Sequence, residues 1–188
     1  MRNFALSTAL SLALVGTVHA QGYFTFGEIP GVDVKPTVEI DLNPAMLNFV
    51  VGATSGSDPE TAKVLAGITN MRVYVYEELG DNAKAVFKFV DDTSRRLERD
   101  GWSTAVRVND DDEQVRIFMK VDPATQDPST SSVSGITLMV TDGDDEAVFI
   151  NIAGKIEAAQ LGKIMGSLDI QGVGQIDLGG VKIGASEK

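Results

Sequence analysis

The chain has no cysteine and a single histidine, His19, among its 188 residues. His19 lies in an N-terminal segment that we expect to be removed, so the mature protein would contain neither residue type. This excludes cysteine nucleophiles, serine–histidine triads and imidazole general bases. It also excludes the usual nitrogen and sulfur ligands of zinc, copper and haem. The chemistry that remains uses carboxylates, lysine, tyrosine, or calcium or magnesium bound through oxygen.

Basic residues are also scarce. Sixteen lysines and arginines stand against 27 acids, which gives a net charge of −11 and a pI of about 4.4. Such a charge argues against nucleic acid as a partner and against electrostatic binding to anionic lipid. Hydrophobic residues make up 43% of the chain, as in ordinary globular proteins, and the length predicts one domain.

Beyond the first twenty residues the sequence has no long apolar run. The pattern of those twenty residues predicts a secretory signal peptide. Arg2 precedes an apolar run over 4–15, and residues 18–20 place small side chains at −3 and −1 of a cleavage site after Ala20. The run is shorter than the roughly 20 residues that span a bilayer. Cleavage would leave 188 − 20 = 168 residues with a charge of 15 − 27 = −12. We expect a soluble periplasmic or extracellular protein, not a lipoprotein, because Gln21 and not cysteine would begin it.

The remaining chain is predicted to have three parts. An extended lead-in occupies 21–31, a single α+β domain occupies 32–169, and a glycine-rich flexible tail occupies 170–188. Turn and cap residues start helices at Asn43-Pro44 and at Asp58-Pro59, and Gly101 ends a longer amphipathic helix over 81–100. Apolar–polar alternation predicts strands, and a final apolar stripe predicts a closing helix over 161–168. The strands are expected at 34–42, 71–76, 102–108, 115–121, 136–140 and 148–152.

The alternation within these strands indicates that one face of the sheet is covered and the other is not. The fold class that follows is an α+β two-layer sandwich, with a mostly antiparallel sheet and helices packed on one face.

Four segments in this order resemble a bacterial exported family catalogued as domain of unknown function 4252. They are NMRVYVY at 70–76, LERDGW at 97–102, VRIFM at 115–119 and VFINIAGKI at 148–156. The resemblance covers about residues 38–168 and implies no activity, cofactor or catalytic residue. Relatives in that family are often exported lipoproteins, whereas this chain lacks the cysteine that would be acylated.

Two acidic loops are predicted to connect neighbouring strands as hairpins. In an antiparallel meander both tips lie at the same end of the sheet. Aspartate and glycine favour turns, and charges protect the rim of a sheet, so the loops have a purely structural interpretation. The other interpretation is a calcium site, because crowded carboxylates are the ligands that calcium prefers. Its candidate ligands are Asp110, Asp111, Asp112, Asp142, Asp144 and Asp145.

The sheet face that we expect to be open is rich in arginine and aromatic side chains. Its candidate binding residues are Arg72, Tyr74, Tyr76, Arg107, Arg116 and Phe118. Arginine and aromatic residues are enriched at recognition surfaces. The same residue types also fill a plain solvated strand face, so the face is either a binding surface or an ordinary exterior.

The function expected from these observations is that of an exported, non-catalytic binding or regulatory module. It would contact a protein or small-molecule ligand through the open sheet face, with no cofactor except calcium in the acidic loops, and without nucleic acid or membrane insertion after cleavage. One alternative is a carboxylate-dependent hydrolase, for which Asp41, Glu77 and Glu78 lie near strand ends. Another is a calcium-stabilised structural protein of the envelope.

Overall fold

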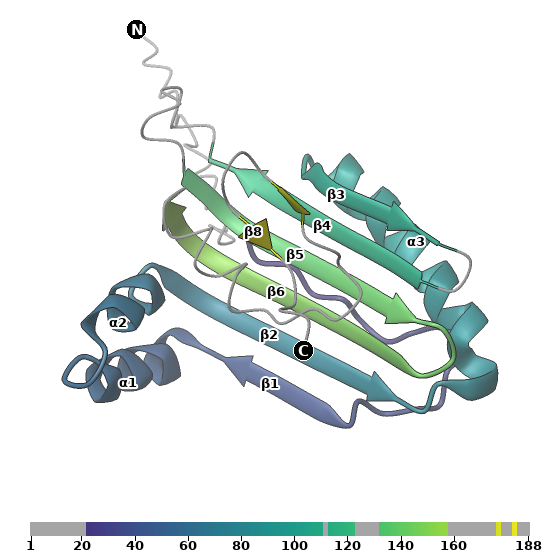
Figure 1. The fold of residues 1–188 in the computed structure, drawn as a ribbon, viewed down its shortest axis with the longest axis horizontal. Helices are drawn as coiled ribbons and strands as arrows, with labels where there is room; N and C mark the ends of the chain where they lie inside the picture. The colour runs from purple at the N-terminus through teal and green to yellow at the C-terminus, as the bar shows by residue number, and fades with distance from the viewer. Residues whose placement is uncertain (1–21, 111–112, 123–131, 158–175, 178–181, 184–188) are drawn as a thin grey trace, which may run out of the picture.

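The computed structural model describes residues 22–110, 113–122, 132–157, 176–177 and 182–183. Its main element is a six-stranded sheet in the order β1-β2-β6-β5-β4-β3, in which every neighbouring pair is antiparallel (Figure 1). The strands are β1 (Val38–Leu42), β2 (Ile68–Glu77), β3 (Ser103–Asn109), β4 (Glu113–Val121), β5 (Ser132–Asp142) and β6 (Glu146–Glu157). The sheet and its helices confirm the predicted α+β sandwich.

Three helices accompany the sheet in the described residues: α1 (Pro44–Thr54), α2 (Pro59–Leu65) and α3 (Ala83–Arg99), the last preceded by a 3₁₀ turn, η1 (Gly80–Asn82). The predicted helix starts are confirmed. The Asn43 side chain accepts hydrogen bonds from the first-turn amides of α1, and Asp58 accepts one from the Thr61 amide. Gly101 has a φ of +76°, the left-handed conformation that ends α3.

Two predictions fall wholly or mostly outside the described residues. The closing helix over 161–168 lies entirely outside them. The tail 170–188 is described only at β7 (Ile176–Asp177) and β8 (Lys182–Ile183), which pair with each other in antiparallel fashion.

One face of the sheet carries an aromatic core beneath α3. Residues 22–32, most of the predicted lead-in, lie along the same face, behind the sheet in Figure 1. Rings from the lead-in, the sheet and α3 meet there: Phe26 and Phe89 lie 5.4 and 5.6 Å from Phe149, centroid to centroid. The buried members are Phe24, Phe26, Ile29, Tyr76, Leu79, Val86, Phe89, Val90, Leu97, Trp102, Phe118, Met139, Ala147 and Phe149.

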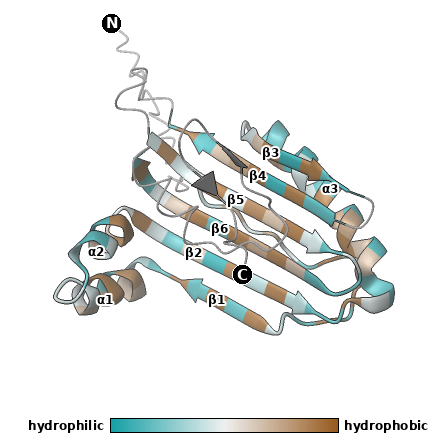
Figure 2. Cartoon of the chain, viewed as in Figure 1, coloured by the Kyte–Doolittle hydropathy of each residue, from teal (hydrophilic) through white to brown (hydrophobic). Residues whose placement is uncertain are grey.

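The opposite face is aliphatic, and we call it the aliphatic face. Antiparallel register aligns its residues in rows across the strands. Figure 2 shows the hydrophobic residues of these strands as brown bands along the ribbon. The rows are Val75–Val148–Val140–Val115, Val73–Ile150–Leu138–Ile117 and Met71–Ile152–Ile136–Met119. Helices α1 and α2 lie beyond one end of the sheet, and the buried Leu47 of α1 joins this aliphatic cluster (Figure 1). Thus α3 packs on one face, while α1 contributes to the other.

The face that was predicted to be open is covered, and that prediction is wrong. Tyr76, Arg116 and Phe118 are buried beneath α3 and residues 22–32, and Arg72 and Tyr74 are half-buried. Alternation correctly separates the two faces of each strand, but it does not say which face is covered. Here both faces are apolar. Only Arg107, on edge strand β3, is exposed as expected.

Candidate functional site

Arg72, a predicted binding residue, is held by contacts within the protein. Its guanidinium forms an ion pair with Asp41 at 2.8 Å, donates to the Thr25 hydroxyl at 3.1 Å, and lies 5.0 Å from the Tyr23 ring centroid. The hydrogen bond to Asp41 raises the pKa of Arg72. The side chain therefore ties together β1, β2 and the N-terminal segment. Asp41, one of the acids considered for hydrolysis, is engaged in the same contact.

The aromatic candidates are part of the core. Tyr74 contacts Phe26 edge-on at 6.2 Å, and Tyr76 lies 5.7 Å from Phe149. Burial raises the pKa of both tyrosines, because the phenolate loses its hydration. Phe118 is fully buried in the same core. These three rings fill space between the sheet and the elements that cover it.

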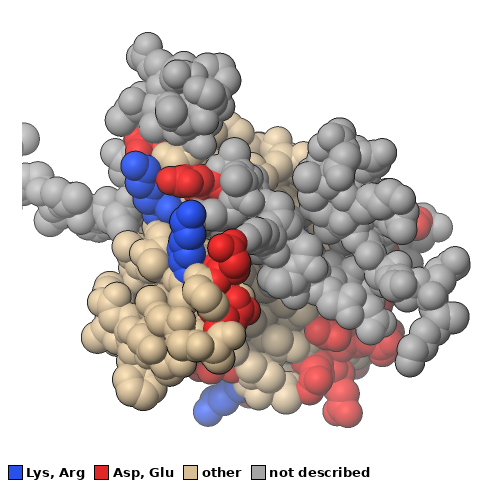
Figure 3. All heavy atoms as spheres, turned by 60° about the vertical axis from the view of Figure 1, so that its left-hand side comes forward, with Lys and Arg blue, Asp and Glu red and all other residues tan. Residues whose placement is uncertain are grey.

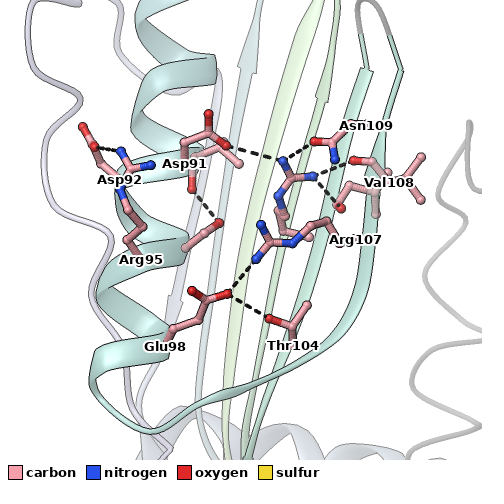
Figure 4. A network of polar contacts seen from close by, with 12 residues as sticks. Asp91, Asp92, Arg95, Glu98, Thr104, Arg107, Val108 and Asn109 are labelled. Atoms are coloured by element: carbon pink, nitrogen blue, oxygen red, sulfur yellow. Dashed lines mark hydrogen bonds and ion pairs between the residues drawn. The ribbon is translucent and has the colours of Figure 1, made fainter.

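Arg116 and Arg107 join the sheet to α3 (Figure 4). The buried Arg116 donates to the Val108 carbonyl and the Asn109 side chain, and its contact with Asp91 of α3 is 3.4 Å. Desolvation lowers the pKa of Arg116. Arg107 pairs with Glu98 of α3 at 2.6 Å. Both arginines thus have partners inside the domain.

The two acidic loops lie at the same end of the sheet, as predicted. The register places Glu113 opposite Asp142, Asp142 opposite Glu146, and Glu146 opposite Glu77. The candidate residues Asp144 and Asp145 accept backbone hydrogen bonds from the turn that follows β2.

The structure describes only part of the two acidic loops. Among the residues that the structure covers, no group of three acidic or other ligating side chains is arranged to hold a metal ion. Asp110 and Asp142 are described, whereas Asp111 and Asp112 are not. Calcium binding therefore stays a prediction.

The surface formed where β1 continues into α1 was not predicted from the sequence. We call it the β1–α1 edge and define it as Val38, Ile40, Met46 and Phe49. These are four of the five large hydrophobic side chains that are exposed in the described residues. Phe49 has 78% and Met46 50% of its surface exposed.

The sequence of α1 contains the signal that could have located this edge. Its eleven residues, PAMLNFVVGAT, include no charged side chain, and Leu47 is its only buried residue. A helix that is apolar all round is normally buried. Figure 3 turns the α1–α2 side forward and shows a broad area there without charged side chains.

The sequence around the edge is acidic between two flanking lysines, Lys35 and Lys63. Between Pro36 and Ala62 the sequence contains four acids, Glu39, Asp41, Asp58 and Glu60, and no basic residue. Of these acids, Asp41 forms the ion pair with Arg72, so the charge beside the edge is partly neutralised.

The sequence was compared with models of protein families, and one family model matches it. The model described as Domain of unknown function (DUF4252) matches residues 33–164, which is more than half of the chain. The chain belongs to the DUF4252 family. The matched DUF4252 region contains the whole six-stranded sheet, all three described helices and the β1–α1 edge. This confirms the resemblance seen in the sequence, and the family description assigns no activity.

Two further comparisons found no counterpart for this DUF4252 protein. Neither the curated proteins nor the solved structures contained a significant match. Within the part of the chain that the structure describes, no helix is both long and apolar enough to cross a membrane.

Proposed function

We propose that this protein is an exported, non-catalytic module that binds a protein partner through the β1–α1 edge. The observation that carries the proposal is the exposure of Phe49 on a helix without any charged residue. Solvated helices usually place polar residues on their outer face, and exposed apolar clusters mark contact surfaces.

The edge is held in place by the fold, which favours binding. Asn43 caps α1 directly after β1 ends at Leu42, and Leu47 anchors the helix in the aliphatic cluster. Met46 and Phe49 are therefore presented by a backbone that is already ordered. Such preorganisation lowers the entropic cost of association.

The exposed area is large enough to matter for affinity. Complete burial of a phenylalanine or methionine side chain contributes about 1.5–3 kcal/mol. Scaled by their exposed fractions, Phe49 and Met46 together would contribute about 2–4 kcal/mol on contact with a partner. This is the size of contribution expected from the central residues of an interface.

The other parts of the proposal rest on the sequence. The leader at 1–20 supports export, and the lack of histidine and cysteine after it supports a role without catalysis. The partner surface differs from the one first expected, because the arginine and aromatic side chains of the sheet are occupied in holding the domain together.

The test compares Phe49→Asp with Val121→Asp. Val121 is also a half-exposed apolar residue, but it lies at the end of β4, away from the edge. Proteins of the cell envelope would be captured on the full-length mature protein and on each variant, and the affinity of the captured partner would then be measured. We expect Phe49→Asp to weaken binding about tenfold or more and Val121→Asp to leave it unchanged. Equal affinity for the wild type and both variants, all with unchanged thermal midpoints, would refute the proposal.

A further inference from the structure

Strand β1, which carries Val38 and Ile40 of the β1–α1 edge, is an outermost strand of the sheet. It pairs with β2 on one side, and in the described part of the chain no strand lies on its other side. Four of its five residues are exposed, Val38 by 41% and Ile40 by 38%. An edge strand directs about half of its backbone N–H and C=O groups away from the sheet. These groups can pair with an added strand.

The two edge strands of the sheet differ in regularity. β1 keeps a single register with β2 from Val38 to Leu42. β3, at the opposite edge, has a register shift between Thr104 and Val106. Such irregularities bend an edge strand and hinder the addition of another one. Of the two edges, β1 is therefore better suited to accept a strand.

The side chains of β1 alternate between the two faces of the sheet. Its apolar residues continue the rows of the aliphatic face, and its two acids, Glu39 and Asp41, lie on the other face. Asp41 forms the ion pair with Arg72. Glu39 is exposed and forms no ion pair with another described residue. A strand added to β1 would therefore meet apolar side chains on one face and an unneutralised carboxylate on the other.

These acids disfavour a second copy of the chain as the added strand. A two-fold axis would pair β1 with β1 in antiparallel fashion. Because side chains alternate with a period of two, a register that keeps the apolar residues of both copies on one face sets each acid opposite an acid. Like charges directly opposite each other destabilise a strand pair. The charge pattern instead fits a strand that carries basic residues.

We propose that β1 binds an extended segment of a partner protein as a seventh strand, and that this segment alternates apolar with basic residues. Its apolar side chains extend the aliphatic face beside Val38 and Ile40, and a basic side chain stands opposite Glu39. In this mode of recognition, backbone hydrogen bonds give affinity and alternate side chains give specificity. The inference rests on the proposed function, since it names the kind of partner that the same edge takes.

The dimensions of β1 set the length of this segment. Five residues of β1 span about 17 Å, so a partner segment of about the same length pairs with the whole strand. α1 begins two residues after β1 ends, and it lies beyond that end of the sheet (Figure 1). A segment that continues past Leu42 therefore comes toward Met46 and Phe49, the other half of the β1–α1 edge.

The probe is a capped peptide of about eight residues that alternates valine with lysine. One control peptide alternates valine with glutamate, and another has the valines and lysines in two separate blocks. Binding to the full-length mature protein would be measured by calorimetry. We expect the alternating valine–lysine peptide to bind about tenfold or more tightly than either control. It should slow the amide exchange of β1 and leave that of β3 unchanged.

A charge reversal tests the position of the added strand. We expect Glu39→Lys to weaken binding of the valine–lysine peptide about tenfold and to strengthen binding of the valine–glutamate peptide. The control is Asp100→Lys, which makes the same change of charge at an exposed position that ends α3, next to β3 at the other edge. It should leave the affinity of both peptides within about twofold of the wild type.

Three results would overturn the inference. Equal affinity for the alternating and the block peptide would show that only charge is recognised. An effect of Glu39→Lys no larger than that of Asp100→Lys would show that the peptide binds elsewhere. Protection of the β1 amides without peptide, lost on dilution, would show that a second copy occupies the edge.

The same variants separate this inference from the proposed function. If Phe49→Asp weakens the captured partner while the valine–lysine peptide does not bind, strand addition is wrong and the proposed function stands. If the peptide binds at β1 while Phe49→Asp leaves the captured partner unaffected, strand addition stands and the role proposed for Phe49 is wrong.

Discussion

Replacing Asn151 by aspartate tests how firmly residues 22–32 are joined to the sheet. Asn151 on β6 is almost completely buried beneath the N-terminal segment. Its side-chain oxygen accepts a hydrogen bond from the Phe24 amide at 2.9 Å. Its amide nitrogen donates to the Gly22 and Ile136 carbonyls at 3.2 and 3.1 Å, and contacts the Thr137 hydroxyl at 3.1 Å.

The magnitude follows from these contacts. Asn151→Asp keeps the acceptor for Phe24 but removes the donor to two buried carbonyls. An unsatisfied buried polar group costs about 1–3 kcal/mol, so we expect a loss of about 2–5 kcal/mol in the free energy of unfolding. For a chain of 150–250 residues, 1 kcal/mol shifts the thermal midpoint by about 2–4 °C, which predicts a decrease of about 4–20 °C.

The loss should depend on pH. Burial and two facing carbonyl oxygens disfavour the carboxylate, so the pKa of the introduced carboxyl group is higher in the folded than in the unfolded state. A raised pKa means that the variant is least destabilised below about pH 4, where the carboxyl group is neutral and can donate. The loss grows as the pH rises through the folded pKa.

The assay is thermal unfolding followed by circular dichroism between pH 4 and pH 8. Amide exchange of residues 22–32 would be measured alongside it, since their anchoring is what the variant disturbs. Asn48→Asp, at an exposed position on α1, is the control for the added charge. An Asn151→Asp midpoint equal to that of the control, or a loss that is the same at every pH, would refute the reasoning.

Three further predictions follow from the site. Arg116→Met should lower the free energy of unfolding by about 1–3 kcal/mol, because the Val108 carbonyl and the Asn109 side chain lose their donor, whereas the acid partner, Asp91, stays half-exposed. Arg116→Lys should cost about 1–3 kcal/mol, because one ammonium group cannot reach the separate acceptors; denaturant titration of both variants checks this. Because the pKa of Tyr74 and of Tyr76 is raised, their phenols should ionise at a higher pH than an ordinary tyrosine in an ultraviolet titration. Stability should then be lost as the pH rises above about 10. Tyr76→Phe should remove part of that late ionisation, and an unchanged titration curve would argue against it. If the acidic loops are only turns, the thermal midpoint should be the same in calcium and in chelator. A rise of the midpoint that is specific to calcium would favour the metal site.

Much of the local structure was predictable from short stretches of sequence. Asn43-Pro44 and Asp58-Pro59 start helices because a side-chain oxygen can accept the first amide hydrogen bonds of its own segment. Gly101 ends α3 because it adopts a positive φ without steric cost. The position of the acidic loops at one end of the sheet followed from counting hairpins in an antiparallel meander.

The candidate site was not predictable in the same way. The arginine and aromatic side chains on β2 and β4 are of the types found at recognition surfaces. They are also long and large enough to fill the space beneath a packed helix. Likewise, the uncharged sequence of α1 suits a buried helix. Only its place beyond the end of the sheet leaves Phe49 in solvent.

The sequence by itself thus determined the order and approximate position of the described helices and strands, and which residues of each strand share a face. These properties depend on neighbouring residues or on composition. The tertiary structure alone decided which sheet face lies under α3, that residues 22–32 belong to the core, and that α1 remains exposed. The physical reason is that a period of two separates two faces without ranking them, and both faces of this sheet are apolar.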